Sequence, residues 1–184
     1  MGLSLPNLIS VGRIILVPLI VWLIVSDRML AAAVVFLLAG ISDAVDGFIA
    51  KRFNQTTELG AYLDPLADKL LLVSIYVSLG FLDHLQPWLV ITVVSRDILI
   101  VGAFLLSWVL ARPVEVRPLV VSKINTVAQI VLAAVVLANA GLNLSVGDAI
   151  FALSLAVAIL TLASGGAYLT EWLRHMANEE PGTL

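Results

Sequence analysis

Charged residues and cysteine are scarce in this chain of 184 residues. Only 12% of the residues are charged and 61% are hydrophobic, whereas a soluble domain is about a quarter charged and about half apolar. A fold of this size cannot bury so much apolar surface in one core, which argues against a soluble globular protein. Disorder is excluded because it requires low hydrophobicity. The absence of cysteine excludes a disulfide framework, a thiolate metal site and a cysteine nucleophile.

The chain also lacks an excess of positive charge. Its formal net charge is −3, so a nucleic-acid partner has no electrostatic support and we expect none. The length suits one domain, and no linker or fixed-period repeat divides the sequence. We therefore treat residues 1–184 as a single membrane domain.

Long apolar stretches follow one another along the sequence. A membrane-spanning helix needs about 20 mostly apolar residues, because the hydrocarbon layer is about 30 Å thick. We predict an all-α, polytopic membrane bundle of six transmembrane helices, separated by turn-forming and charged residues. The six stretches are Leu8–Val25, Met29–Ala50, Gly60–Leu82, Trp88–Val109, Ser122–Ala140 and Gly147–Leu173.

Basic residues are distributed unevenly between the predicted connections. Arg28 is the only basic residue in the odd-numbered connections. Because Lys and Arg favour the cytoplasmic side, both termini and the even-numbered connections are predicted to face the cytoplasm. The other basic residues behind this prediction are Arg13, Lys51, Arg52, Arg112, Arg117, Lys123 and Arg174.

Four carboxylates lie close to one membrane boundary. Asp43 and Asp46 are three residues apart, and Asp64 and Asp68 are four apart, so each pair occupies one helix face. A short connection makes the two helices antiparallel neighbours, and the pairs can face each other. One of these acids alone could be a helix cap or a surface charge.

Four such acids together need protons or cations to neutralise them, since even one charge at the bilayer centre costs about 3 kcal/mol or more. Oxygen ligands suit Mg²⁺ or Mn²⁺, and four carboxylates can hold two ions.

Small and basic residues lie between the acidic pairs. Gly47, Ala50 and Gly60 allow a ligand to approach the backbone, and Lys51 and Arg52 add positive charge. This mixture suits a diphosphate with a lipid tail. The alternatives are close helix packing for the glycines and the cytoplasmic charge bias for Lys51 and Arg52.

The run from Asp43 to Lys51, continued by Gly60, Asp64 and Asp68, resembles the signature of the CDP-alcohol phosphotransferases. That signature is D-x₂-D-G-x₂-A-R-x₈-G-x₃-D-x₃-D, and seven of its eight fixed positions match with every spacing kept. Lys51 replaces the usual Arg, and a lysine lacks the planar fork that binds phosphate with two hydrogen bonds. The resemblance covers roughly residues 5 to 130, and the last helix adds little to it.

The resemblance implies transfer of a phosphatidyl group from CDP-diacylglycerol to an alcohol, with CMP as the leaving group. It assigns metal binding to Asp43, Asp46, Asp64 and Asp68, and Asp68 would also be the general base. The segment from Pro6 to Arg13 resembles the entry helix of the family. The residues implied to bind the CDP-lipid are Asn7, Arg13, Gly47, Ala50, Lys51 and Gly60. The family also implies a homodimer.

The acceptor alcohol is suggested by the fourth and fifth stretches. Arg96 and Asp97 lie in mid-span, where an ion pair marks either a functional site or a structural salt bridge. We predict that Arg96, Lys123 and Asn125 bind an acceptor that carries phosphate.

Asp64–Lys69 resembles the glycerophospholipid branch of the family. Val94–Asp97 and Ser122–Thr126 resemble CMP-forming cardiolipin synthases, which use phosphatidylglycerol as acceptor. Phosphatidylglycerophosphate synthases, which use glycerol 3-phosphate, tend to have a second lysine where this chain has Asn125. A neutral residue there favours a phosphodiester with one charge, so phosphatidylglycerol is the preferred acceptor and glycerol 3-phosphate the alternative.

Two further functions fit parts of the sequence. Intramembrane acids also occur in transporters of divalent metals or protons, but here they cluster at one side and no inverted repeat is visible. The small residues of Ala163–Ala167 could pack helices in a scaffold. We expect an integral protein of a bacterial cytoplasmic membrane, with its site on the cytoplasmic side.

Overall fold

The computed structural model describes residues 5–53, 58–109 and 120–178, and the side chains of residues 11–42, 67–102 and 120–174. Every regular element within these ranges is a helix. This confirms the all-α prediction, and each predicted stretch coincides with one helix. The helices are α1 Leu5–Val25, α2 Met29–Phe53, α3 Glu58–Phe81, α4 Pro87–Val109, α5 Val120–Leu142 and α6 Gly147–Asn178.

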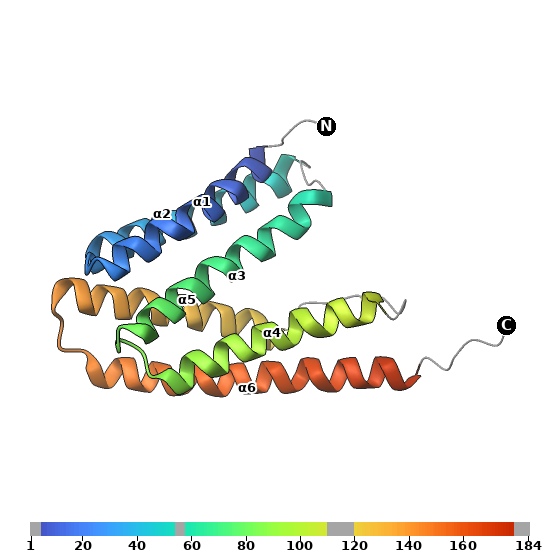
Figure 1. Cartoon of the computed structure of the whole chain (residues 1–184). Helices are drawn as coiled ribbons and strands as arrows, with labels where there is room; N and C mark the ends of the chain where they lie inside the picture. Colours follow the sequence, from blue (N-terminus) through green and yellow to red (C-terminus); the bar gives the residue numbers. More distant parts are fainter. Residues whose placement is uncertain (1–4, 54–57, 110–119, 179–184) are drawn as a thin grey trace.

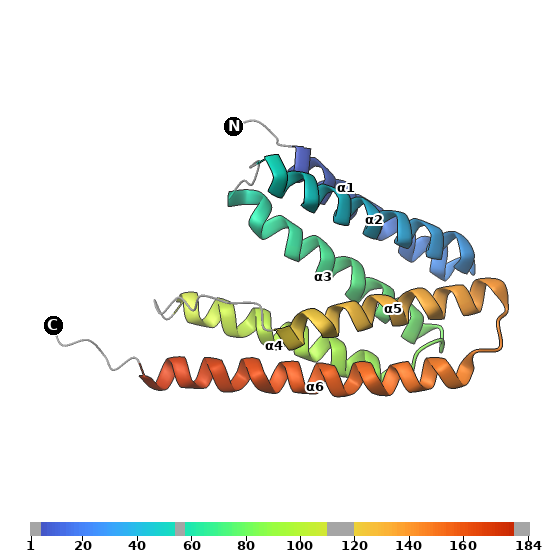
Figure 2. The same cartoon turned by 180° about the vertical axis from the view of Figure 1, so that it is seen from behind.

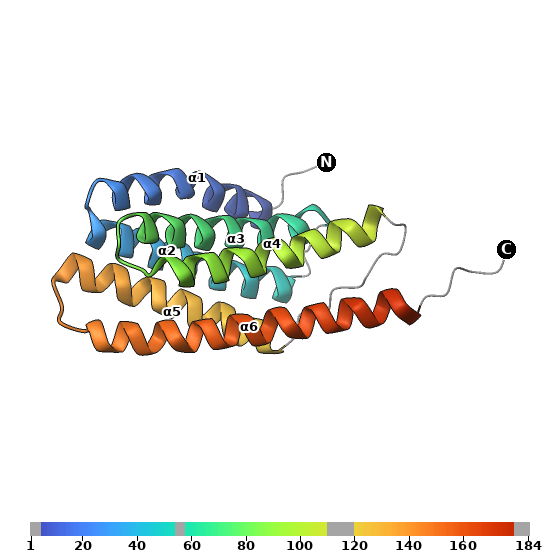
Figure 3. The same ribbon diagram turned by 60° about the horizontal axis from the view of Figure 1, so that its bottom comes forward.

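The helices pack as two groups of three. In the first group α1 packs against both α2 and α3, and in the second α6 packs against both α4 and α5. Contacts of α2 with α5, and of α3 with α4 and α5, join the groups (Figures 1 and 2). The long helix α6 runs along the whole second group (Figure 3).

Short turns from α1 to α2, from α3 to α4 and from α5 to α6 lie together at one end of the bundle, which we call the turn end (Figure 1). Asp27, Asp83 and Asn143 have φ values of 58°, 58° and 52° in these turns. Asp and Asn tolerate this left-handed conformation better than most residues. The amide of Arg28 donates to the carbonyl of Leu23 at 2.8 Å, which satisfies the end of α1 as in a Schellman motif.

Apolar side chains fill the bundle near the turn end. The helices approach closely there: a Cβ placed on Gly141 of α5 would lie 2.5 Å from the backbone nitrogen of Leu30 in α2. A glycine is therefore required at this crossing. The largest fully buried apolar side chains are Ile20, Ile24, Ile75, Tyr76, Leu79, Leu85, Leu89, Leu132 and Leu137.

The outer surface is also apolar. Large side chains on several helices are well exposed, among them Ile15, Phe81, Ile98 and Ile159. In the described part of the chain, α5 and the segment Gly147–Arg174 of α6 are long and apolar enough to cross a membrane. Val11–Val25 and Met29–Ser42 are shorter apolar segments by the same measure.

Candidate active site

Arg13 of α1 and Asp68 of α3 form an ion pair between two residues that the sequence assigned to one site. Arg13 is 4% exposed, and its Nη1 donates to Oδ1 of Asp68. The Asp68 side chain remains 46% exposed, so a ligand can reach it. The close packing of α1 on α3 brings the predicted CDP contact next to the predicted general base.

A cavity of about 300 Å³ opens beside this ion pair. Its polar wall consists of Arg13, Asp68 and Thr126, and the rest of its lining is apolar. The lining comes from α1, α2, α3 and α5. The apolar members are Phe36, Leu37, Ala39, Gly40, Ile41, Leu71, Leu72 and Ile130. The cavity therefore offers a charged wall to a polar group and apolar walls to a hydrocarbon chain.

The other predicted metal ligands lie on described helices. Asp43 and Asp46 are in the C-terminal part of α2, and Asp64 is in the N-terminal part of α3. Figures 1 and 2 show that these helix ends lie at the same end of the bundle as the beginning of α1. Among the described side chains, no three acidic or histidine residues are grouped as a metal site.

The site roles of several residues remain predictions. The side chains of Asp43, Asp46, Asp64, Asn7, Gly47, Ala50, Lys51 and Gly60 lie outside the described residues.

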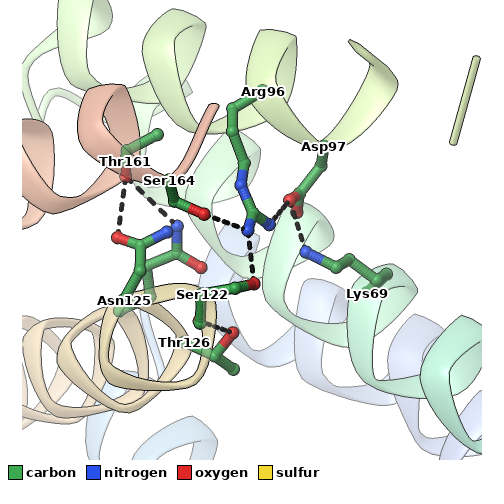
Figure 4. Close-up of polar contacts among 9 residues, drawn as sticks. Lys69, Arg96, Asp97, Ser122, Asn125, Thr126, Thr161 and Ser164 are labelled. Atoms are coloured by element: carbon green, nitrogen blue, oxygen red, sulfur yellow. Dashed lines mark hydrogen bonds and ion pairs between the residues drawn. The ribbon is translucent and has the colours of Figure 1, made fainter. Parts of the chain in front are cut away.

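A second group of charges surrounds Asp97, deeper between α3 and α4. Arg96 and Asp97 are 5% and 6% exposed. Oδ1 of Asp97 accepts a hydrogen bond from Nη1 of Arg96 at 2.7 Å and another from Nζ of Lys69 (Figure 4). The structure thus places Asp97 in a buried salt bridge that links α3 to α4. Two cations share one anion here, so the group has a net positive charge.

The guanidinium of Arg96 also reaches α5 and α6. Its Nη2 donates to Oγ of Ser122 at 2.5 Å and to Oγ of Ser164 at 2.6 Å. The aromatic ring of Tyr168 lies 5.6 Å from its Cζ, within range of a cation–π interaction. Arg96 of α4 is therefore held by contacts from α5 and α6 as well as by Asp97 on its own helix.

The other two predicted acceptor residues differ in environment. Lys123 is exposed at the start of α5, next to Ser122. Asn125 is fully buried, and its Oδ1 accepts a hydrogen bond from Oγ1 of Thr161 at 2.9 Å. Its Nδ2 has no partner among the side chains that the structure describes. Lys123 can meet a ligand directly, whereas Asn125 lies in the contact between α5 and α6.

Some residues of the site were not predicted from the sequence. Lys69 immediately follows the signature residue Asp68, and that position is the signal that could have identified it. Ser164 and Tyr168 are 68 and 72 positions after Arg96, and no local pattern connects them with it. Only the packing of α6 against α4 reveals their contacts.

Comparison with known proteins adds evidence on the family. The family described as CDP-alcohol phosphatidyltransferase matches residues 3–162. The chain is 36% identical to the CDP-diacylglycerol–glycerol-3-phosphate 3-phosphatidyltransferase of Escherichia coli (strain K12), over 92% of this chain and 95% of that protein. It is 34% identical to the CMP-forming cardiolipin synthase of Rattus norvegicus, over 90% of this chain and 60% of that protein.

A chloroplastic CDP-diacylglycerol–glycerol-3-phosphate 3-phosphatidyltransferase 1 of Oryza sativa subsp. japonica is 40% identical over 73% of this chain and 46% of that protein. The chain spans about half the length of the rice relative, 60% of the rat relative and nearly all of the bacterial one. With the signature from Asp43 to Asp68 and the match over residues 3–162, the chain belongs to the CDP-alcohol phosphatidyltransferase family.

Proposed function

We propose that the protein transfers a phosphatidyl group from CDP-diacylglycerol to a glycerol-type alcohol and releases CMP. The observation that carries this proposal is the Arg13–Asp68 pair in the wall of an otherwise apolar cavity. A lipid with a charged headgroup needs both kinds of surface. The names of the relatives from rat and E. coli agree with this reaction.

In the proposed reaction Asp68 is the general base. Its exposed carboxylate takes the proton of the acceptor hydroxyl, and the acceptor oxygen attacks the phosphorus that carries the diacylglycerol. The bond from this phosphorus to the oxygen of the CMP phosphate breaks, and CMP leaves with the electron pair. Arg13 pairs with Asp68 and places a positive charge beside the phosphates.

We also propose a cofactor of Mg²⁺ or Mn²⁺, with two ions held by Asp43, Asp46, Asp64 and Asp68. The donor set fits, because all its atoms are carboxylate oxygens and the Asp68 carboxylate is accessible at the cavity. Bound ions supply positive charge that stabilises the phosphate oxygens during transfer.

The proposed acceptor is phosphatidylglycerol, which gives cardiolipin. Arg96 and Lys123 bind its phosphodiester, and the neutral Asn125 keeps the number of positive charges low. Glycerol 3-phosphate is the second candidate, because the relatives from rice and E. coli are named for it. Sequence identity does not separate the two acceptors, since relatives of both kinds align with similar identity.

The proposed setting is a bacterial cytoplasmic membrane crossed by all six helices, with both termini and the site on the cytoplasmic side. The exposed apolar side chains and the two long apolar helices support this arrangement. We further propose a homodimer, as the family resemblance implies. Cross-linking in nanodiscs tests this, and recovery of monomers alone contradicts it.

The proposed activity is tested with purified protein, CDP-diacylglycerol and either phosphatidylglycerol or glycerol 3-phosphate. We expect CMP release that stops with a chelator and returns with Mg²⁺ or Mn²⁺. Mass spectrometry of the lipid product identifies the acceptor: cardiolipin supports the first candidate and phosphatidylglycerol phosphate the second. No CMP with either acceptor contradicts the proposed function.

A further inference from the structure

Three contacts on α6 hold the side chain of Arg96. Ser164 accepts a hydrogen bond from its guanidinium at 2.6 Å, and the Tyr168 ring lies 5.6 Å from its Cζ. A Cβ placed on Gly165 would lie 3.5 Å from Cγ of Arg96, so the aliphatic part of the side chain packs on the backbone of α6. Tyr168 follows Ser164 by four positions and Gly165 by three, so all three residues lie toward one side of the helix.

These contacts lie beyond the part of the chain that the family match covers. The match ends at residue 162, and Ser164, Gly165 and Tyr168 follow it on the same continuous helix α6. A contribution of α6 to the site therefore does not follow from family membership.

These contacts fix the orientation of the Arg96 guanidinium but leave some of its N–H donors unused. A guanidinium has five N–H groups, and the contacts with Asp97, Ser122 and Ser164 occupy three of them. The Nε atom has no partner among the described residues. A long arginine side chain loses much rotamer freedom when it is ordered, so contacts that order it beforehand increase its affinity for an anion.

We propose that Ser164 and Tyr168 are positioning residues that orient Arg96 toward the phosphate of the acceptor. The C-terminal half of α6 thereby sets the affinity for the acceptor and leaves the CDP-lipid unaffected. This inference rests on the proposed function, in which Arg96 binds the acceptor. It assigns a role in substrate selection to a segment of α6 that the family match does not reach.

The test compares Ser164→Ala and Tyr168→Leu with the unmodified protein. We expect each variant to raise the KM for the acceptor about tenfold, because a hydrogen bond or ring contact to a charged group is lost. The kcat and the KM for CDP-diacylglycerol should stay within about twofold. A purely structural role would lower kcat and affect both substrates.

Matched variants separate the contacts from packing. Ser154→Ala removes another buried hydroxyl of α6, one with no hydrogen-bond partner among the described residues, and should leave the acceptor KM unchanged. Tyr168→Phe keeps the ring and Ser164→Thr keeps the hydroxyl, so both should retain near-normal acceptor KM. An acceptor KM raised equally by Ser154→Ala contradicts the proposal.

A double variant tests whether Ser164 affects the acceptor by way of Arg96. In an Arg96→Gln variant, Ser164→Ala should cause no further loss of kcat/KM for the acceptor, which is measured below saturation. Additive losses overturn the inference. A protein that releases CMP normally but shows unchanged acceptor KM in both α6 variants overturns the inference alone. A protein that releases no CMP with either acceptor overturns the proposed function and the inference with it.

Discussion

The side chains buried in α3 and α4 differ between the turn end and the middle of the bundle. Near the turn end they are Ile75, Leu79 and Leu89, whereas about two turns away the same helices carry the buried Arg96 and Asp97 together with the half-buried Lys69. Apolar packing and three satisfied helix ends keep the helices in register at the turn end. In the middle, ion pairs between helices hold charged groups in place. The comparison teaches that the same helices are held together in two ways, by apolar packing at the turn end and by charged side chains in the middle.

The largest loss of stability is expected in the middle of the bundle. Asp97→Ala leaves the buried Arg96 and the half-buried Lys69 without their shared anion, which should cost about 3 kcal/mol or more of unfolding free energy. Asp97→Asn keeps an oxygen acceptor and should cost less. Thermal unfolding in detergent measures both. An unchanged midpoint for Asp97→Ala would show that the ion pair contributes nothing to the fold.

A smaller loss is expected at the turn end. Gly141→Ala places a Cβ against backbone atoms of Leu30, which cannot rotate away, and should destabilise the protein by about 1–3 kcal/mol. The KM for both substrates should remain unchanged. Gly166→Ala is the control, since nothing lies within 4 Å of a Cβ there. Equal midpoints for the two variants would contradict the close crossing of α2 and α5.

The smallest effect concerns one turn residue. In Asp27→Ala the alanine must adopt a φ of 58°, a left-handed conformation that Asp tolerates better than Ala. The substitution should therefore lower the free energy of unfolding by about 1 kcal/mol. Asp27→Asn and Asp27→Gly should be close to neutral, because both residues accept this conformation. The same unfolding experiment distinguishes them. If Asp27→Gly loses as much stability as Asp27→Ala, a side-chain contact of Asp27 contributes more to stability than its backbone conformation does.

Hydropathy predicted the helices well but not all their ends. The predicted span Met29–Ala50 continues as helix to Phe53, and the last span continues from Leu173 to Asn178. Apolar run length reflects the thickness of the membrane, whereas a helix continues through polar residues such as Lys51 and Arg52 as long as its backbone bonds are satisfied. The first and third helices likewise begin before their apolar runs.

The candidate site was predictable only where residues are near in sequence or match the signature. The structure brings together Arg13 and Asp68, two residues that the resemblance assigned to one site, while their roles remain predictions. The contacts of Arg96 with Ser164 and Tyr168 depend on how α4 and α6 cross. Neither spacing nor periodicity encodes such a crossing, and for the same reason the contact of Lys69 with Asp97 was not predicted.

The central claim is that Asp68 is the general base of the reaction and that the residues of the turn end take no part in it. It is tested most directly by CMP release from Asp68→Asn and Asp83→Asn, two identical substitutions, one within α3 and the other in the turn that follows it. Asp83 has a left-handed φ of 58° that Asn tolerates. We predict that Asp68→Asn lowers kcat by a factor of about 10²–10⁴ while Asp83→Asn retains normal kcat. Release of CMP at an unchanged rate by the folded Asp68→Asn variant would contradict the account.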